Sequence, residues 1–393
     1  MLAAGVPKFS IKGKTLLPVV PGGMGAGVSA HRLAGAVAGA GAMGTIASID
    51  LRHHHPDLME QAGKRPDKAE LDAINLVALD REIRMAREAA QGNGLVAVNV
   101  MKAVTEHAAY VRQACESGAE AIVMGAGLPL DLPELAEDYP EVALIPILSD
   151  ARGVGVVLKK WRRLKKFGSG GRLPDAIVIE HPRYAGGHLG ATRSEDVGDA
   201  RFDFKDVLKG VFELFRELGI ERGRIPLIAA GGVNSHEKFA EVMALGADAV
   251  QLGTPFAVTA EGDAHPDFKK VLAEAKPEDI VTFMSVAGLP ARAVKTPWLA
   301  NYLKREHKLQ ARAKADRERC TAGLHCLIQC GLRDGIARAG QFCIDTQLAA
   351  ALKGDIRKGL FFRGSESLPF GNAIRSVKEL IDYLLTGVKP ALA

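Results

Sequence analysis

The chain has 393 residues, 47% of them apolar and 25% charged, and its 51 basic and 46 acidic residues leave a net charge of +5. This length fits one α/β barrel with an appendage better than one small domain. The 43 glycines, about 11% against a usual value near 7%, and the 5% of aromatic residues disfavour a coiled coil, an all-helical repeat and a disordered chain. The mild charge predicts no nucleic-acid partner.

Eight short apolar runs, each followed by glycine or a polar turn, predict β-strands. The runs are continuous rather than alternating, as expected for parallel strands that are covered on both faces. Pro146 makes one run weaker than the others, because proline cannot donate a hydrogen bond within a central strand. The predicted strands are Leu16–Val20, Met43–Ile46, Val96–Asn99, Ala121–Met124, Leu144–Ile147, Ala176–Glu180, Leu227–Ala230 and Ala249–Leu252.

The segments between these strands predict helices, and a further amphipathic helix is predicted near the end, at Ser376–Leu385. Eight strands that alternate with helices favour a TIM (β/α)8 barrel over a doubly wound sheet. In such a barrel the chemistry lies just after the carboxyl ends of the strands. The predicted helices between the strands are Ser29–Ala40, Leu71–Ala90, Thr105–Ser117, Leu132–Asp138, Asp150–Lys166, Phe204–Leu218 and Ser235–Leu245.

The pattern changes after Phe256, where the sequence becomes more polar and contains most of the cysteines. We therefore predict that residues 1–256 and 345–393 form the barrel. Residues 257–344 are predicted to form an inserted, smaller and mainly helical domain that covers the substrate. The sequence contains no run of about 18 apolar residues without a charge or a helix breaker, so we predict neither a membrane span nor a membrane partner. The N-terminus does not resemble a secretory signal.

Two glycine turns follow the seventh and eighth predicted strands. Gly231 and Gly232 follow the seventh, and Gly253 and Thr254 follow the eighth. Their backbone amides can converge on one phosphate group, because glycine lets the backbone approach the phosphate oxygens. The alternative is a pair of tight turns that bind nothing.

The sequence AGGHLG, residues 185–190, follows the sixth predicted strand. Gly186 and Gly187 let this loop turn sharply and hold His188 over the mouth of the barrel. Histidine titrates near neutrality and can act as a base or as a hydrogen-bond donor to a substrate. We predict that His188 is catalytic or contacts the substrate, and the alternative is an ordinary surface histidine.

Six motifs occur in order along the chain and cover about residues 17–256: PVVPGGMG, VNV, GAGLP, AGGHLG, AAGGV and QLGTPF. Together they resemble the nitronate monooxygenase family, formerly called 2-nitropropane dioxygenases. GLPARAVKT (288–296) and GLFFRGS (359–365) extend the resemblance weakly toward the end. The family includes FMN-dependent enoyl-acyl carrier protein reductases, and the chain resembles a longer bacterial subgroup with cysteines near its end. Each motif alone is weak, but the ordered set is specific.

The resemblance implies an FMN-binding barrel with a smaller domain over the substrate. It implies that Gly22, Gly23 and Met24 lie along the isoalloxazine ring and that Asn99 binds the polar edge of that ring. It places the phosphate on the two glycine turns, adds Gly186 and Gly187 to the cofactor-binding residues, and matches His188 to the active-site histidine of the family. The chain departs from many members at Tyr184, where they have an acidic residue, and in the basic insertion at residues 159–172.

Four of the five cysteines lie close together in the sequence: Cys320, Cys326, Cys330 and Cys343. Four thiolates can hold zinc or an iron–sulfur cluster, although the spacing matches neither a zinc knuckle nor a ferredoxin motif. The alternative is a set of structural cysteines on a helix. The odd total argues against a disulfide scaffold and for the reducing cytoplasm.

These features lead to three functional hypotheses. The first is an FMN-dependent oxidoreductase that oxidises alkyl nitronates with dioxygen. The second is a reductase of enoyl thioesters in which NAD(P)H reduces FMN. The third is a barrel that binds FMN or another phosphate ligand without turnover. The sequence carries no signal for the oligomeric state.

Overall fold

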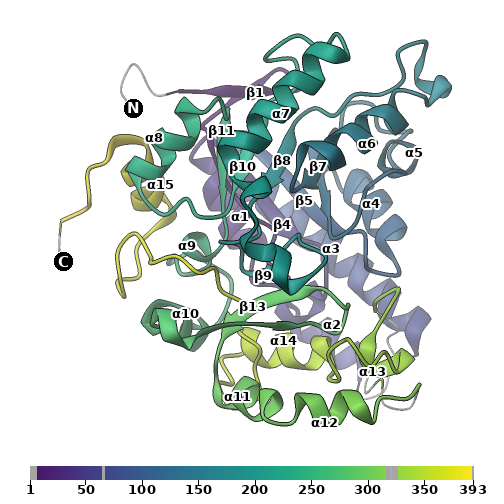
Figure 1. The fold of residues 1–393 in the computed structure, drawn as a ribbon, viewed down its shortest axis with the longest axis vertical. Helices are drawn as coiled ribbons and strands as arrows, with labels where there is room; N and C mark the ends of the chain where they lie inside the picture. The colour runs from purple at the N-terminus through teal and green to yellow at the C-terminus, as the bar shows by residue number, and fades with distance from the viewer. Residues whose placement is uncertain (1–6, 64–66, 316–319, 321–325, 392–393) are drawn as a thin grey trace.

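The computed structural model describes residues 7–63, 67–315, 320 and 326–391. Eight parallel strands form one sheet in the order β3-β11-β10-β8-β7-β6-β5-β4 (Figure 1). The two end strands lie beside each other, and Leu17 N–H donates to Gly41 O at 2.9 Å in the segments that precede them. The sheet is therefore a nearly closed TIM-type barrel. Its strands are β3 (Val19–Pro21), β4 (Met43–Ala47), β5 (Leu95–Met101), β6 (Ala121–Gly125), β7 (Ala143–Leu148), β8 (Ile177–Glu180), β10 (Leu227–Ala230) and β11 (Ala249–Leu252).

An N-terminal hairpin closes one end of the barrel. Its strands β1 (Phe9–Ile11) and β2 (Lys14–Leu16) are antiparallel and join through Lys12 and Gly13, both with positive φ, as a tight hairpin turn requires. Phe9, Ile11 and Leu16 pack in one apolar cluster with alternate residues of the barrel strands. The interior of the barrel is thus filled with side chains and is not a channel.

Helices surround the barrel and bury the other residues of its strands in a second, larger core. The last helix, α15 (Val377–Thr386), packs against α8 and α1 and so completes the helical layer between them (Figure 1). The helices before the change at Phe256 are α1 (His31–Gly39), α2 (Pro56–Ala62), α3 (Lys68–Ala90), α4 (His107–Glu116), α5 (Leu132–Leu135), α6 (Ala151–Trp161), α7 (Phe204–Glu217) and α8 (His236–Ala244).

The segment after Phe256 contains strands as well as helices. Strands β12 (Ile280–Met284) and β13 (Pro290–Val294) form a three-stranded antiparallel sheet with β9 (Gly187–His188), which belongs to a barrel loop. This sheet ties the later segment to the barrel. The helices that follow β11 are α9 (Thr254–Ala257), α10 (Pro266–Glu274), α11 (Pro297–Leu303), α12 (Glu306–Ala311), α13 (Gly331–Asp334) and α14 (Ile344–Leu352), and α10 to α14 lie below the barrel in Figure 1.

The structure confirms the barrel and the eight predicted strands, with one shift. The first predicted run covers the end of β2 and the start of β3, because Pro18 separates two short strands. Pro146 lies inside β7, where it faces Met124 of β6, so one proline does not break this strand. The boundaries of the inserted segment stay a prediction. No helix of the described residues is long and apolar enough to cross a membrane.

Candidate functional site

The turn after β3 fits closely against the end of β5. Gly22 N–H donates to Leu252 O at 2.9 Å, which fixes this turn beside β11. A Cβ atom on Gly23 would lie 2.2 Å from Cβ of Asn99 and 2.8 Å from its Oδ1. Real Cβ atoms do not approach this closely, so only glycine lets the backbone lie against the Asn99 amide. The structure therefore brings together two residues that the family resemblance assigns to the flavin ring.

Met24 follows in the same turn, which is closed by a pair of hydrogen bonds. Met24 N–H donates to Ser29 Oγ at 2.9 Å, and Ser29 N–H donates to Met24 O at 3.1 Å. The partly buried Met24 side chain packs against the main core and against a smaller cluster that includes residues of α10 and α14. The turn that contains Gly22, Gly23 and Met24 is thus fixed at both ends before any ligand binds.

The two predicted phosphate turns lie at the ends of neighbouring strands, β10 and β11. Gly231 and Gly232 have φ of +94° and +81°, a region that favours glycine. A Cβ on Gly232 would lie 2.8 Å from the Tyr184 ring, whereas one on Gly253 would meet nothing within 4 Å. The turn at Gly232 is therefore covered by Tyr184, and the Gly253 backbone borders open space.

Thr254 joins the second turn to a segment far away in the sequence. Gly364 N–H donates to Thr254 Oγ1 at 3.0 Å, and a Cβ on Gly364 would lie 2.8 Å from Tyr184 O. A Cβ on Gly186 would in turn lie 2.5 Å from the carbonyl carbon of Arg363. The segment Arg363–Ser365, which we call the strap, therefore crosses the loops of Thr254 and Gly186.

His188 lies in β9, where it pairs with Ala291 of β13. Its Nε2 is 2.9 Å from Ser285 Oγ, in the turn between β12 and β13. The neighbouring Gly187 has φ of +68°, so the two glycines do allow the sharp loop that precedes the imidazole. Burial lowers the pKa of His188 to about 4. The imidazole is therefore neutral at pH 7 and can accept a proton at one ring nitrogen or donate a hydrogen bond from the other.

Two side chains at the mouth were not among the predicted site residues. Glu180 ends β8, and burial raises its pKa to about 7, because no nearby cation stabilises its charged form. An acidic residue at the carboxyl end of a barrel strand often belongs to the active site. Glu180 was predicted to lie at such a strand end but was not named as a candidate site residue. Ser285 had no such signal, since only the folding of a distant hairpin brings it to His188.

The residues present fit a flavin mononucleotide in two respects. Gly23 lets the turn lie directly against the Asn99 amide, which can both donate and accept hydrogen bonds as the polar edge of a flavin does. The turns at Gly231, Gly232 and Gly253 lie at the end of the barrel where phosphates bind in this fold, and the Gly253 backbone borders open space. Gly186 lies against the strap, and Gly187 lies near the ring of Phe362, the residue before the strap.

The four clustered cysteines do not form a recognisable metal site. Among the described residues, no group of three or more His, Cys, Asp or Glu is placed to hold a metal ion. His325, which lies next to Cys326 in the sequence and is a further possible ligand, lies outside the described residues. Cys326 and Cys330 lie in a loop and at the start of α13 rather than on one helix face. Burial raises the pKa of both thiols, which opposes the thiolate form that a metal needs. The zinc or iron–sulfur prediction, which included Cys320 and Cys343, is therefore not supported.

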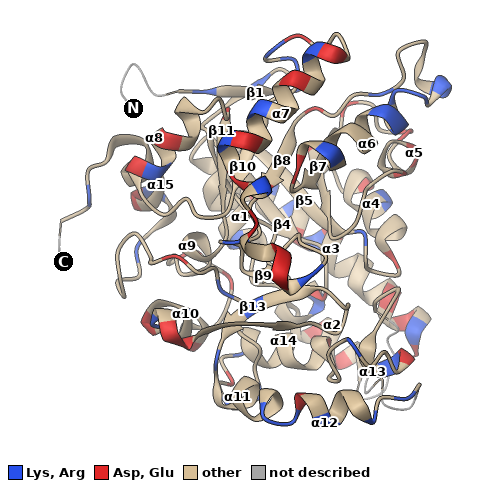
Figure 2. Cartoon of the chain, viewed as in Figure 1, with Lys and Arg blue, Asp and Glu red and all other residues tan. Residues whose placement is uncertain are grey.

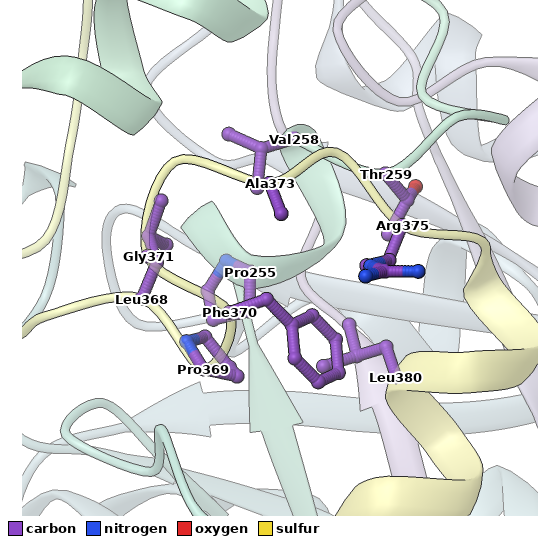
Figure 3. A pocket seen from close by; sticks show the side chains of 10 residues that line it. All are labelled: Pro255, Val258, Thr259, Leu368, Pro369, Phe370, Gly371, Ala373, Arg375 and Leu380. Carbon is purple, nitrogen blue, oxygen red and sulfur yellow. The ribbon is translucent and has the colours of Figure 1, made fainter. Parts of the chain in front are cut away.

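A small cavity lies on the outer side of α9 (Figure 3). Pro255 and Val258 line it from α9 and its end, and Phe370 and Arg375 line it from the segment before α15. Its volume of about 10 Å³ has room for about one water molecule. The cavity is thus too small for a substrate and belongs to the packing of the C-terminal segment.

The basic stretch at residues 159–166 lies at the end of α6 and in the turn that follows. Lys166 forms an ion pair with Glu137, and charges of both signs alternate over the chain (Figure 2). This arrangement agrees with a solvated helix face, the simpler interpretation of the stretch.

Comparison with known proteins agrees with these observations. A protein-family model described as "Nitronate monooxygenase" matches residues 9–387. A probable nitronate monooxygenase of Bacillus subtilis is 25% identical over 302 residues, which cover 74% of this chain and 80% of that protein. A second one, from Staphylococcus saprophyticus, is 27% identical over 36% of this chain and only 40% of its own length.

Among solved structures, FabK from Thermotoga maritima superposes with a TM-score of 0.63 at 23% identity, over 94% of this chain and 91% of that one. At this identity the likeness shows the fold alone, and it extends through the segment after Phe256. Because the family model covers nearly the whole chain, the chain belongs to the nitronate monooxygenase family, a family of FMN-dependent oxidoreductases.

Proposed function

We propose that this enzyme binds FMN at the mouth of the barrel and oxidises alkyl nitronates with dioxygen. The observation that carries the proposal is His188, whose imidazole is kept neutral by burial and lies 2.9 Å from the Ser285 hydroxyl group. A neutral imidazole beside an anionic nitronate can donate a hydrogen bond to a nitronate oxygen without adding a charge that must be neutralised. The family membership and the fit of Gly23 against Asn99 support the same site.

Each part of the mouth would have a separate task. Gly22, Gly23 and Met24 would hold one face of the flavin ring, and Asn99 would hydrogen-bond its polar edge. Gly231, Gly232, Gly253 and Thr254 would bind its phosphate, with Gly186 and Gly187 beside them. The cofactor supplies electron transfer between substrate and dioxygen, and His188 orients the substrate anion or takes a proton from a neutral nitroalkane.

A reductase of enoyl thioesters is the second candidate, and Glu180 is the observation that favours it. A carboxyl group with a pKa near 7 is partly protonated at neutral pH and can donate the proton that such a reduction requires. NAD(P)H would then be the source of electrons. The likeness to FabK shows only that the fold is shared.

Anaerobic stopped-flow absorbance with propane-2-nitronate, propionate-3-nitronate, NADH and NADPH separates the candidates. Rapid bleaching of the flavin by a nitronate, followed by reoxidation with dioxygen, is the expected result. Bleaching by NADH or NADPH but by neither nitronate would reject the proposal in favour of the reductase. Bound flavin that none of the four reduces would indicate a barrel that binds without turnover.

A further inference from the structure

Two arginines are buried in the later segment of the chain, one in β13 and one in the strap that crosses the loops of Thr254 and Gly186. Arg292 of β13 is 7% exposed and Arg363 of the strap is 3% exposed. Arg292 Nη1 donates to Ala185 O at 2.5 Å and to Pro182 O at 3.4 Å. Arg363 donates from Nε to Leu272 O at 2.9 Å and from Nη1 to the carbonyl oxygens of Gly364 and Glu366, at 2.8 and 3.1 Å. All of these acceptors are neutral carbonyl groups.

Neither guanidinium forms an ion pair with a carboxylate of the described residues. The acid whose charge acts on both is Glu366, and its Oε1 accepts a hydrogen bond from Ser365 Oγ at 3.2 Å instead. Burial lowers the pKa of both arginines, which reflects the cost of keeping a charge away from water. Buried charges in proteins are normally paired, so two of them bonded only to carbonyls indicate a place for an anion.

The two arginines flank the point where three loops meet. Arg292 lies opposite Gly187 across the β9–β13 pair, and its guanidinium holds the loop that leads to Gly186. Arg363 begins the strap, whose Gly364 is bonded to Thr254 and whose Ser365 N–H donates to Tyr184 O at 3.2 Å. The later segment of the chain thus adds two buried positive charges beside these turns, where Lys238 of α8 already acts on Tyr184 and Glu366.

We infer that Arg292 and Arg363 supply the positive charge of a phosphate-monoester subsite at the crossing of the strap with the Thr254 and Gly186 loops. Its ligand is the phosphate of the flavin, so this inference rests on the FMN part of the proposed function but not on the nitronate substrate. A phosphate dianion is a strong acceptor for charge-assisted hydrogen bonds from arginine. Because both charges are shielded from water, they act on the phosphate even where they do not touch it.

The test compares FMN with riboflavin, which has the same ring but no phosphate. The full chain is freed of flavin, and binding of each compound is followed by quenching of flavin fluorescence in the wild type and in Arg292→Gln and Arg363→Gln. We expect FMN to bind about 10- to 100-fold more weakly to either variant, and riboflavin to bind within about twofold of the wild type. Arg292→Lys and Arg363→Lys should retain part of the preference for FMN, because they keep the charge.

Arg375→Gln is the matched control, since Arg375 is also partly buried but forms an ion pair with Glu379 at 3.4 Å. It should leave the FMN-to-riboflavin ratio unchanged. An equal loss of both flavins in the Arg292 and Arg363 variants would overturn the inference and show that these residues only fasten loops. Unchanged FMN binding would overturn it as well.

Two further arms cover the other outcomes. If the variants do not fold, the wild type is tested with inorganic phosphate. Phosphate should raise the melting temperature of the flavin-free chain and should compete with FMN but not with riboflavin. The absence of such competition would reject the subsite. If the variants change the preference for NADPH over NADH while FMN binding stays the same, the subsite belongs to another phosphate and the assignment to FMN is wrong. Tight FMN binding without nitronate oxidation would refute the proposed function alone.

Discussion

The barrel turns and the segment after Phe256 contribute to the mouth in different ways. The turns offer mainly backbone, with glycines at positions where a side chain would collide or where φ is positive, as at Gly23 and Gly232. The later segment offers side chains that fix or charge those turns, among them Ser285, Arg292 and Arg363. We therefore expect the turns to define where a ligand lies, and the later segment to determine how firmly and with what charge it is held.

The largest effect is expected when the barrel loops lose His188, the side chain that they contribute to the proposed chemistry. His188→Ala should lower kcat/KM with a nitronate about 100- to 10,000-fold while the flavin spectrum persists. Because burial lowers the pKa of His188 to about 4, the wild type should lose activity only as the pH falls through about 4, not near 6.5. His307→Ala on the exposed face of α12 is the control, and a loss below fivefold in His188→Ala would contradict the assignment.

A change in the turn after β3 tests whether backbone shape determines binding. In Gly23→Ala the new Cβ would lie 2.2 Å from the Cβ of Asn99, so one of the two must move. Overpacking of this kind costs about 1–3 kcal/mol. Because the displaced residues belong to the proposed flavin site, we expect the affinity for FMN to fall about 10- to 100-fold. Gly198→Ala, where a Cβ would meet nothing within 4 Å, should bind FMN normally. Equal titration curves for the two variants would refute the close fit.

The pH dependence of stability tests the environment of Glu180. Its folded pKa is raised to about 7 from an ordinary 4.5, so its protonation stabilises the fold below pH 4.5, and this stability is lost as the pH rises through about 7. We expect urea denaturation to show that the wild type loses about 1–3 kcal/mol more than Glu180→Gln between pH 5 and pH 8. Glu217→Gln on the exposed face of α7 should behave as the wild type. Parallel curves for Glu180→Gln and the wild type would show that this carboxyl group is not buried as described.

The smallest effect is expected for a side chain of the later segment that acts through His188. Ser285→Ala removes the hydroxyl group 2.9 Å from His188 Nε2 and should lower kcat/KM about 3- to 10-fold, with FMN affinity unchanged. Ser10→Ala, at an exposed position of β1, is the control. A fall in FMN affinity as large as the fall in kcat/KM would mean that Ser285 shapes the flavin site rather than positioning His188.

The sequence predicted those parts of the molecule that depend on neighbours in the chain. The eight strands and their glycine turns were visible because continuous apolar runs and the glycines after them are local patterns. The N-terminal hairpin was missed, because the alternation in Phe9–Leu16 is too short to be distinguished from a loop. Strands β12 and β13, which pair with each other, were also missed, and the pairing of β13 with β9 joins residues about 100 positions apart in the sequence.

The same distinction holds within the candidate site. The family motifs identify both Gly23 and Asn99. Only the structure shows that the two residues lie so close together that a side chain at position 23 would collide with Asn99. The sequence could not show that Arg292 is buried without an ion pair, because the residues around an arginine in a strand do not reveal whether a carboxylate lies beside it in the fold. The cysteine cluster is a different case: closeness in sequence suggested metal ligands, but among the described residues no group of three or more is placed to hold a metal ion.

The order of the strands has a consequence for how the chain folds during synthesis. β3 is made early, but its ladder partner is β11, more than 200 residues later. Such distant pairings are slow to form, and until this one does, the hydrogen-bonding edge of β3 that β11 occupies stays uncovered. A nascent chain is therefore expected to expose this edge until β11 has left the ribosome.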